Sequence, residues 1–259
     1  MKTALVTGAG KRLGRAMALY LAGRGYDVAI HYASSDAGAR EVADQIIAMG
    51  QRAVTIQADL LVEDEVQTLL PSAAEALGGP ITCLINNASI FEYDNVSSAT
   101  RQSWDRHLES NLRAPFVLTQ AMAAQGLEPG TDENGEPLAT GLIVNMIDQR
   151  VRKLTPEFMT YTIAKMGLWA MTQTTAQALA PAIRVNAIGP GPTMQGARQS
   201  AEHFANQRAA TVLKRGADPE GICAALGYFL DARAITGQLL CVDGGQHLAW
   251  ETPDVLGVE

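Results

Sequence analysis

Residues 3–14 read TALVTGAGKRLG, a short β-branched strand that runs into a glycine-rich turn and the start of a helix. Glycines at positions 8, 10 and 14 let the backbone of such a turn approach a ligand, and the helix that follows offers free N–H groups at its positive end. This combination is typical of a pyrophosphate-binding turn. The spacing departs from the common Gly-x-Gly-x-x-Gly fingerprint, so the turn alone is also compatible with a plain tight turn.

The rest of the chain repeats the alternation of apolar strand and amphipathic helix. We predict strands at residues 3–7, 28–32, 53–57, 81–85, 142–147, 183–188 and 238–242. Helices are predicted at residues 13–24, 36–49, 62–77, 100–125, 156–180 and 218–231. The strands are nearly continuous apolar runs, as expected when helices cover both faces of a parallel sheet. The expected fold class is α/β, a Rossmann-type doubly wound parallel sheet of about seven strands with helices on both faces.

Two stretches interrupt this rhythm. Residues 126–140 are rich in Gly, Pro and acidic residues and predict a surface loop. Residues 189–217 begin with GPGP and contain one weak helix, and a connection of that length in a compact domain is typical of a functional lid. We expect both stretches to shape a substrate pocket. Because no repeat or linker divides the chain, residues 1–259 are predicted to form a single domain with a substrate loop at about 189–217.

Composition excludes several classes of protein. The 259 residues are 47% hydrophobic and 18% charged, with a net charge of −7, which argues against disorder and against a broad surface for nucleic acid or anionic membrane. No run approaches the roughly 18 apolar residues that span a bilayer. Cys83, Cys223 and Cys241 form no CxxC pair and no metal-ligand cluster. We therefore expect reduced thiols, a cytoplasmic location and no metal site.

A Tyr-x-x-x-Lys pair is the strongest candidate for catalysis. Tyr161 and Lys165 are four residues apart on the helix predicted at 156–180, so their side chains project from one face. A nearby ammonium favours the phenolate and would lower the pKa of the phenol, which suits a proton donor near neutral pH. Asp148 follows the strand at 142–147, on the carboxyl edge of the sheet. Without its context, the pattern is also compatible with a surface Tyr/Lys pair and a solvated aspartate.

Two further strands end in polar residues. Asp59 follows the strand at 53–57, and Asn86-Asn87-Ala88 ends the strand at 81–85. Ligands of open α/β sheets bind at this edge, so these residues are candidate ligand contacts. Capping of the turns that follow is their alternative role.

Asn111 lies inside the helix predicted at 100–125, four residues before Pro115. Because proline has no N–H, the carbonyl of Asn111 loses its helical partner and the helix should kink there. A free carbonyl at a kink can hold an ordered water. An ordinary proline kink is the alternative interpretation.

Taken together, these residues resemble the short-chain dehydrogenase/reductase family over essentially the whole chain. The resemblance follows that family's TGxxxGxG turn, NNAG motif, helix-kink asparagine, Ser–Tyr–Lys catalytic set and PG motif. The matching positions are Thr7 to Gly14, Asp59, Asn86 to Ala88, Asn111, Tyr161, Lys165, Pro190-Gly191 and Val242 to Gly245. The resemblance implies a nicotinamide dinucleotide cofactor, a small-molecule substrate and a homotetramer.

Three departures from the family pattern resemble the pteridine reductase branch of the family. Arg12 replaces the middle glycine of the turn, Ser89 replaces the last glycine of NNAG, and Asp148 replaces the catalytic serine thirteen residues before Tyr161. In that branch an aromatic residue two positions after the serine stacks on the pterin, and Phe91 matches it. An aspartate paired with a tyrosine suits delivery of a proton to a ring nitrogen, whereas a serine hydroxyl suits polarisation of a ketone.

The resemblance also implies roles for individual residues. The expected catalytic set is Asp148, Tyr161, Lys165 and Asn111, with Lys165 also binding the nicotinamide ribose and Asn111 holding a water. The expected cofactor-binding residues are Gly8, Lys11, Arg12, Leu13, Gly14, Tyr32, Ser34, Ser35, Asp59, Leu60, Asn87, Ala88, Ser89, Tyr161, Lys165, Pro190, Gly191 and Thr193. The expected substrate-binding residues are Arg12, Ser89, Phe91, Asp148 and Tyr161.

The second strand bears on the choice of cofactor. It ends His31-Tyr32-Ala33-Ser34-Ser35, with no acid directly at the strand end to bind a free ribose 2′-hydroxyl; Asp36 is the first. The pteridine reductase branch usually carries a basic residue where Ser34 lies. Lys11, Arg12 and the two serines can nevertheless supply donors to a 2′-phosphate. We therefore expect NADPH in preference to NADH.

The function that follows is an NADPH-dependent reductase that transfers hydride to a flat C=N heterocycle of the dihydropteridine or dihydrofolate class. One alternative is a carbonyl or 3-oxoacyl reductase of the same family. Another is a cofactor-binding sensor without turnover. A panel of pterins and ketones separates the first two, and cofactor binding with no consumption of cofactor would indicate the third.

Overall fold

The computed structural model describes residues 1–196 and 199–251. Seven parallel strands form one sheet in the order β3-β2-β1-β4-β7-β8-β9. Their bounds are β1 Thr3–Val6, β2 Asp27–Tyr32, β3 Ala53–Gln57, β4 Cys83–Asn86, β7 Gly141–Met146, β8 Ile183–Pro190 and β9 Leu239–Val242. The predicted doubly wound parallel sheet is confirmed. Residues 197–198 of the expected lid and residues 252–259 of the expected domain lie outside the described ranges.

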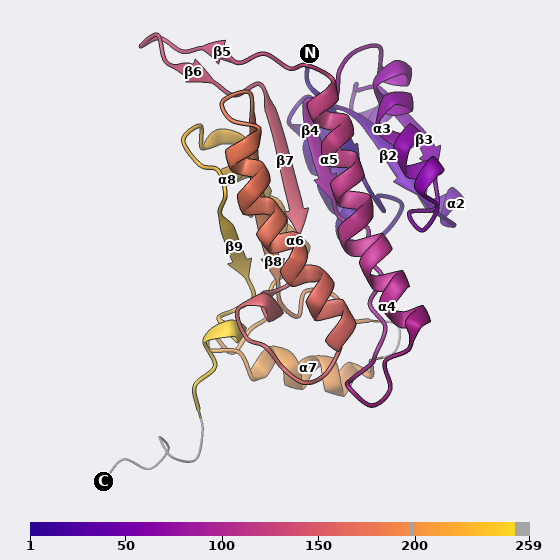
Figure 1. Cartoon of the computed structure of the whole chain (residues 1–259), viewed down its shortest axis with the longest axis vertical. Coiled ribbons are helices and arrows are strands. Elements are labelled where there is room, and N and C mark those ends of the chain that lie inside the picture. Colours follow the sequence, from indigo (N-terminus) through magenta and orange to yellow (C-terminus); the bar gives the residue numbers. More distant parts are fainter. Residues whose placement is uncertain (197–198, 252–259) are drawn as a thin grey trace.

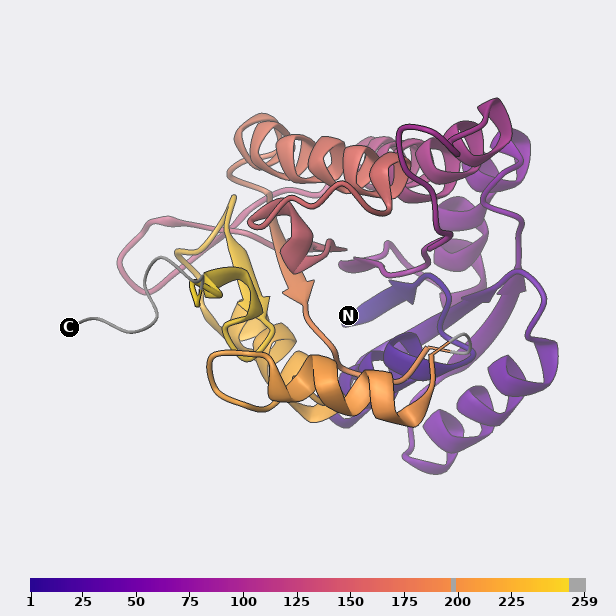
Figure 2. The ribbon, with the colours of Figure 1, turned by 90° about the horizontal axis from the view of Figure 1, so that it is seen from below.

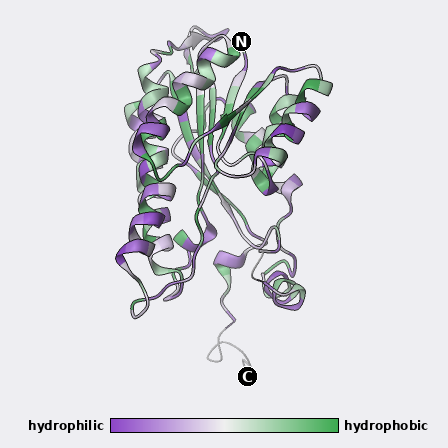
Figure 3. Cartoon of the chain, turned by 90° about the vertical axis from the view of Figure 1, so that its right-hand side faces the viewer, coloured by the Kyte–Doolittle hydropathy of each residue, from purple (hydrophilic) through white to green (hydrophobic). Residues whose placement is uncertain are grey.

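Helices cover both faces of the sheet, which explains the apolar strands. Along β1, Ala4 and Val6 pack into one core cluster and Leu5 into the other, as the alternation of side chains along a strand requires. The first cluster lies under α1 Arg12–Gly23, α2 Asp36–Ala48 and α8 Pro219–Asp231. The second lies under α3 Glu63–Leu77, α5 Ala114–Ala124 and the end of α6 Met159–Ala178. Figure 3 shows the hydrophobic strands between helices whose outer faces are hydrophilic.

All seven strands point their carboxyl ends to one edge of the sheet. The chain segment after β8, with helix α7 Ala201–Ala209, crosses this edge, as seen from the side in Figure 1 and from below in Figure 2. α7 is the weak helix expected in the lid, and none of its residues is buried. The edge therefore has the position at which open α/β sheets bind ligands.

The helix predicted at residues 100–125 is interrupted. It divides into α4 Arg101–Leu108, a π-helical segment Glu109–Arg113, and α5, which has Pro115 in its first turn. The expected break near Asn111 therefore takes the form of a π-bulge, which accommodates the missing proline N–H within one continuous helical path.

Residues 126–140 lie at the surface as predicted, but the expectation that they help to shape the substrate pocket is wrong. Strands β5 Gly130–Thr131 and β6 Pro137–Leu138 form an antiparallel hairpin whose turn is held by the carboxylate of Asp132, which accepts hydrogen bonds from the N–H groups of Asn134 and Glu136. The hairpin leads into the amino end of β7, so it projects from the end of the sheet opposite α7 (Figure 1). It is too far from the carboxyl edge to line a pocket there.

Three further observations concern the whole described part of the chain. No helix in residues 1–196 and 199–251 is long and apolar enough to cross a membrane. Within the same ranges no group of three or more His, Cys, Asp and Glu side chains is placed to hold a metal ion. The three cysteines are unpaired thiols.

Candidate active site

The glycine-rich turn connects β1 to α1 and depends on two glycines. Gly8 has a φ of +64°, in the left-handed region, and a Cβ on Gly14 would lie 2.2 Å from the carbonyl oxygen of Gly8. Lys11, the N-cap residue of α1, makes no side-chain cap, and the first turn of α1 carries no acidic residue. The N–H groups at the start of α1 and the positive end of its dipole therefore suit a phosphate ligand.

Arg12 lies at the position where the resembling family carries a glycine, and its φ of +54° explains that preference. Its guanidinium donates to the carbonyl oxygens of Gln195 at 2.7 Å and Met194 at 3.1 Å. Arg12 thus joins the turn to the segment after β8. Its contacts in the structure are to this segment, while the expected contact with a cofactor phosphate stays a prediction.

The asparagines at the end of β4 fasten the next loop to this turn. The N–H groups of Asn87 and Ala88 donate to the Thr7 hydroxyl at 2.8 and 2.9 Å, and the Asn87 side chain donates to the Thr7 carbonyl at 2.8 Å. The loop that carries Ser89 and Phe91 therefore begins at a fixed point beside the turn.

Asp148, Tyr161 and Lys165 come together as predicted. The Tyr161 hydroxyl donates to Asp148 Oδ2 at 3.0 Å, and Asp148 Oδ1 accepts from the N–H of Arg150 at 2.8 Å. Lys165, one of the most deeply buried side chains, donates from Nζ to the carbonyl of Met146 at 2.8 Å. Its Nζ lies 5.7 Å from the centroid of the Tyr161 ring. The arrangement can hold a proton between a phenol and a carboxyl group beside an ammonium.

The expectation that Lys165 lowers the pKa of Tyr161 is wrong. Burial, followed by the Asp148 carboxylate, raises the pKa of the Tyr161 phenol well above its usual value. Burial also raises the pKa of Asp148 and lowers that of Lys165 to about 8. The phenol is hydrogen-bonded to the carboxylate, whereas the ammonium is bound to the backbone carbonyl of Met146. The unit that can give up a proton is therefore the Asp148–Tyr161 pair rather than an acidified tyrosine alone.

Asn111 lies in the π-helical segment and is fully buried. Its side-chain oxygen accepts from the N–H of Ile90 at 3.0 Å and its amide group donates to the Ile90 carbonyl at 2.8 Å. The side chain thereby fixes the loop between Ser89 and Phe91. Sequence reasoning assigned a role to the backbone carbonyl of Asn111 and missed this side-chain role; the water at the carbonyl stays a prediction.

Phe91 lies between aromatic neighbours that sequence reasoning missed. Its ring stacks on Phe158 at 4.3 Å with an interplanar angle of 9°, and it meets the edge of Tyr161 at 4.7 Å. The guanidinium of Arg150 lies 4.8 Å from the centre of the Phe158 ring. Phe158 precedes α6 with a φ of +57°. An aromatic residue just before the Tyr-x-x-x-Lys helix was the only local signal for this neighbour.

One pocket at the carboxyl edge joins many of the predicted residues. Those that line it are Arg12, Leu13, Phe91, Asp148, Pro190, Gly191 and Thr193, together with Gln149, Arg150 and residues of the segment after β8. Gly191 is required there, because a Cβ on it would lie 2.6 Å from that of Asp243. Tyr161 does not line this pocket, but its hydroxyl donates to Asp148, which does.

Further predicted residues lie at the carboxyl ends of β2 and β3. Asp59 caps a turn, since its carboxylate accepts from the N–H of Leu61 at 3.0 Å. Asp36 forms an ion pair with Arg40 at 3.0 Å. The hydrogen bond from Arg40, and to a smaller extent the one from the Tyr32 hydroxyl, lowers the pKa of the Asp36 carboxyl. Asp36 is therefore already engaged, and the strand end presents Ser34 and Ser35 instead.

Comparison with known proteins agrees with this geometry. A family model described as enoyl-(acyl carrier protein) reductase matches residues 8–247. A 3-oxoacyl-[acyl-carrier-protein] reductase of Staphylococcus epidermidis is 31% identical over 252 residues, which cover 95% of this chain and 99% of that protein.

Two solved structures are also similar. An alternative dihydrofolate reductase 1 of Brucella suis in complex with NADP is 43% identical, has a TM-score of 0.90, and shares 98% of each chain. An angucycline C-6 ketoreductase with bound NADP is 31% identical, has a TM-score of 0.86, and shares 95% of this chain and 96% of its own. With a doubly wound sheet, a buried Tyr161–Lys165 pair and these matches, the chain belongs to the short-chain dehydrogenase/reductase family, and the predicted family is confirmed.

Proposed function

We propose that this protein is an NADPH-dependent reductase that transfers hydride to the C=N bond of a dihydropteridine-like ring, of the dihydropteridine or dihydrofolate class. The observation that carries the proposal is the hydrogen bond between Asp148 and Tyr161 at 3.0 Å beside Phe91. The similarity to the alternative dihydrofolate reductase of Brucella suis supports it.

The residues present fit an NADP(H) cofactor. The start of α1 and the turn from Gly8 to Gly14 would hold the pyrophosphate. The 2′-phosphate would face Ser34, Ser35 and Lys11. At the other end of the cofactor, Lys165 would bind the nicotinamide ribose and Thr193 would contact the carboxamide. When bound, the dihydronicotinamide supplies the hydride. Both the dihydrofolate reductase and the ketoreductase carry NADP, in agreement with the expected cofactor.

NADPH is expected to bind at least tenfold more tightly than NADH, because Lys11, Ser34 and Ser35 can donate to the 2′-phosphate and no acidic residue stands directly at the end of β2. Calorimetric titration of the protein with each cofactor measures the difference. Equal binding of the two, or tighter binding of NADH, would overturn the assignment and make Asp36 a ribose ligand.

The protein residues would deliver the proton that accompanies the hydride. Burial raises the pKa of Asp148, so its carboxyl group retains a proton to higher pH than a free aspartate. A protonated Asp148 can donate to Tyr161 Oη, which leaves the phenol O–H for the ring nitrogen of the substrate. The product carries the hydride on carbon and this proton on nitrogen, and solvent then reprotonates Asp148. When it is protonated, the Lys165 ammonium stabilises negative charge on Asp148.

Phe91 would provide the flat surface on which the substrate ring stacks. Phe158 lies against Phe91 but does not line the pocket, whereas Phe91 does. The Phe158 ring therefore supports Phe91 in the orientation required for an offset stack with a heteroaromatic ring.

Replacing Phe91 with Ala is expected to weaken binding of a dihydropteridine by about 1–3 kcal/mol, on the scale of lost ring contact and stacking, with a smaller change in kcat. Phe91→Tyr keeps the ring and should retain most of the affinity. Steady-state KM values for dihydrobiopterin on the three proteins test this. An unchanged KM in the Ala variant would show that the substrate does not lie on Phe91.

A carbonyl or 3-oxoacyl reductase remains the second candidate, because the Staphylococcus epidermidis reductase and the ketoreductase are also similar to this chain. The carboxyl group of Asp148, in place of a serine hydroxyl, favours the pteridine substrate. A sensor without turnover is the third candidate, and the complete Asp148, Tyr161 and Lys165 cluster argues against it.

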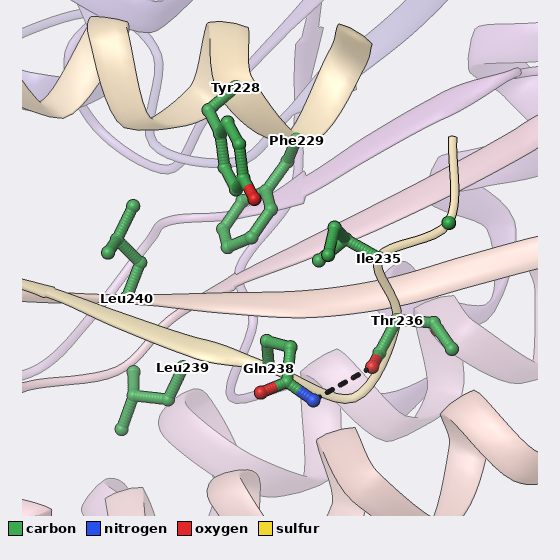
Figure 4. A pocket seen from close by; sticks show the side chains of 8 residues that line it. Tyr228, Phe229, Ile235, Thr236, Gln238, Leu239 and Leu240 are labelled. Atoms are coloured by element: carbon green, nitrogen blue, oxygen red, sulfur yellow. Dashed lines mark hydrogen bonds between the residues drawn. The ribbon is translucent and has the colours of Figure 1, made fainter. Parts of the chain in front are cut away.

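We also propose a single domain that assembles as a homotetramer in the cytoplasm. β9 is an edge strand of the sheet. Leu240 on β9 is 38% exposed and Tyr228 on α8 is 51% exposed, and both line the apolar hollow shown in Figure 4. On the other side of the sheet, Phe116 and Ile163 are exposed on α5 and α6. Two exposed apolar surfaces on opposite sides of one chain suit a tetramer built from two kinds of contact.

A further inference from the structure

A second polar cluster lies behind the active site, and none of its members belongs to the proton-donating pair. Asp94 is in the loop after β4, His107 is on α4, and Thr160 is in the first turn of α6. Each of the three side chains belongs to a residue that is at most 1% exposed. Buried polar groups of this kind are costly unless they are hydrogen-bonded to one another.

The donors and acceptors of the cluster form a chain with one direction. His107 Nε2 accepts from the N–H of Glu92 at 3.1 Å, so the hydrogen of the neutral imidazole is on Nδ1. Nδ1 then donates to Thr160 Oγ1 at 2.7 Å, and the Thr160 hydroxyl donates to Asp94 Oδ2. Burial, as the largest influence, lowers the pKa of His107, which agrees with a neutral ring.

Asp94 also fixes the start of α6. Its Oδ1 accepts from the N–H of Thr160 at 3.1 Å, and its backbone carbonyl accepts from the N–H of Met159 at 3.3 Å. The first N–H groups of a helix have no partner within the helix, and two of them are bound here by one residue of the loop between β4 and α4. This loop carries Phe91 and is called the Phe91 loop below. Tyr161 is the next residue of α6.

The same loop is held on both sides of Phe91. Asn111 binds Ile90 on one side, and His107 binds Glu92 on the other. The hydrogen bonds from His107 to Thr160 and from Thr160 to Asp94 therefore connect this loop to the start of α6. They fix the ring of Phe91 relative to that of Tyr161, whose centroid is 4.7 Å away.

We propose that Asp94, Thr160 and His107 are positioning residues that fasten the Phe91 loop to the first turn of the catalytic helix, so that the stacking surface and the proton donor keep one relative orientation. The hydroxyl of Thr160 is the central link, because it both accepts from His107 and donates to Asp94. The proposal rests on the proposed function for the identity of the flat substrate, while the coupling itself is a property of the protein alone.

Thr160→Val and Thr160→Ser test the link. Valine has the shape of threonine without the hydroxyl, and the backbone N–H of residue 160 still binds Asp94, so the start of α6 is preserved. The Val variant should raise KM for dihydrobiopterin about tenfold, with a smaller fall in kcat, since buried groups lose a hydrogen bond and the loop shifts. The Ser variant should remain within about threefold of the parent protein, and the Kd for NADPH should be unchanged in both.

A structural role without positioning gives a different result. In that case Thr160→Val would reduce dihydrobiopterin turnover, diketone turnover and NADPH affinity to similar extents, and the proposal would be wrong. An unchanged KM for dihydrobiopterin in Thr160→Val would overturn it equally.

A substrate-free measurement separates this proposal from the proposed function. The chain has five phenylalanines, so 4-fluorophenylalanine labelling gives five fluorine resonances, and Phe91→Tyr assigns the one from Phe91. Thr160→Val should shift or broaden that resonance, and Thr160→Ser should restore it. If the parent does not reduce dihydrobiopterin but the resonance responds in this way, the proposed function fails and the positioning role stands. If the resonance is insensitive to Thr160→Val, the positioning role is refuted.

Discussion

Tyr161→Phe is expected to lower the turnover number about a thousandfold while NADPH affinity and Tm remain close to those of the parent protein. The substitution removes only the hydroxyl, whose hydrogen bond to Asp148 Oδ2 is the route by which a proton reaches the substrate. The ring remains, and with it the edge contact to Phe91 at 4.7 Å. Single-turnover oxidation of bound NADPH in the presence of substrate measures the chemical step directly.

The affinity for NADPH is the control for this variant, since a variant with normal cofactor binding has kept its fold and its cofactor site. A loss of only a few fold in turnover would contradict the role of Tyr161. It would indicate that Asp148 donates its proton through water without the phenol.

Asp148→Ser is expected to reduce kcat/KM for a dihydropteridine at least about a hundredfold and to preserve or increase the rate with a simple activated ketone. Serine supplies a hydroxyl that can polarise a carbonyl, but it has no exchangeable carboxyl proton for a ring nitrogen. Asp148 also caps the short 3₁₀ turn that follows β7 by accepting from Arg150, and serine is an equally good capping residue. The loss should therefore arise in the chemistry and not in the fold.

The pH profile distinguishes this account from a general loss of activity. Burial raises the pKa of Asp148, so its proton is present at low pH and is lost as the pH rises through that value. The rate of pteridine reduction by the parent should fall over the same interval. In Asp148→Ser the fall should disappear, and persistence of the same profile would assign it to another group.

The sequence predicted the sheet well because its strands are determined locally. Each central strand is a short apolar run that must be covered on both faces, and that requirement alone places Leu5 against one helical layer and Val6 against the other. The break near Asn111 was predictable for the same reason, since one proline removes one N–H. That the break is a π-bulge, with the Asn111 side chain bound to Ile90, depends on a loop distant in the chain.

What could not be predicted depends on contacts between distant residues. The guanidinium of Arg12 binds Met194 and Gln195 across 182 and 183 positions, and no local pattern encodes that contact. Thr160 and His107 are separated by 53 positions, so their hydrogen bond has no sequence signature. The sign of the Tyr161 pKa shift was missed because it depends first on the burial of the phenol and then on the Asp148 carboxylate bound to it, and both are visible only in the structure.

The central claim is that the Asp148–Tyr161 pair serves a flat C=N substrate. Its most direct test is the specificity constant kcat/KM of the unaltered protein with NADPH, measured for dihydrobiopterin, dihydrofolate, a diketone and a 3-oxoacyl thioester. We expect the value for one of the two pteridines to be at least about a hundredfold above that for either carbonyl substrate. Efficient reduction of a carbonyl substrate with no detectable turnover of either pteridine would contradict it.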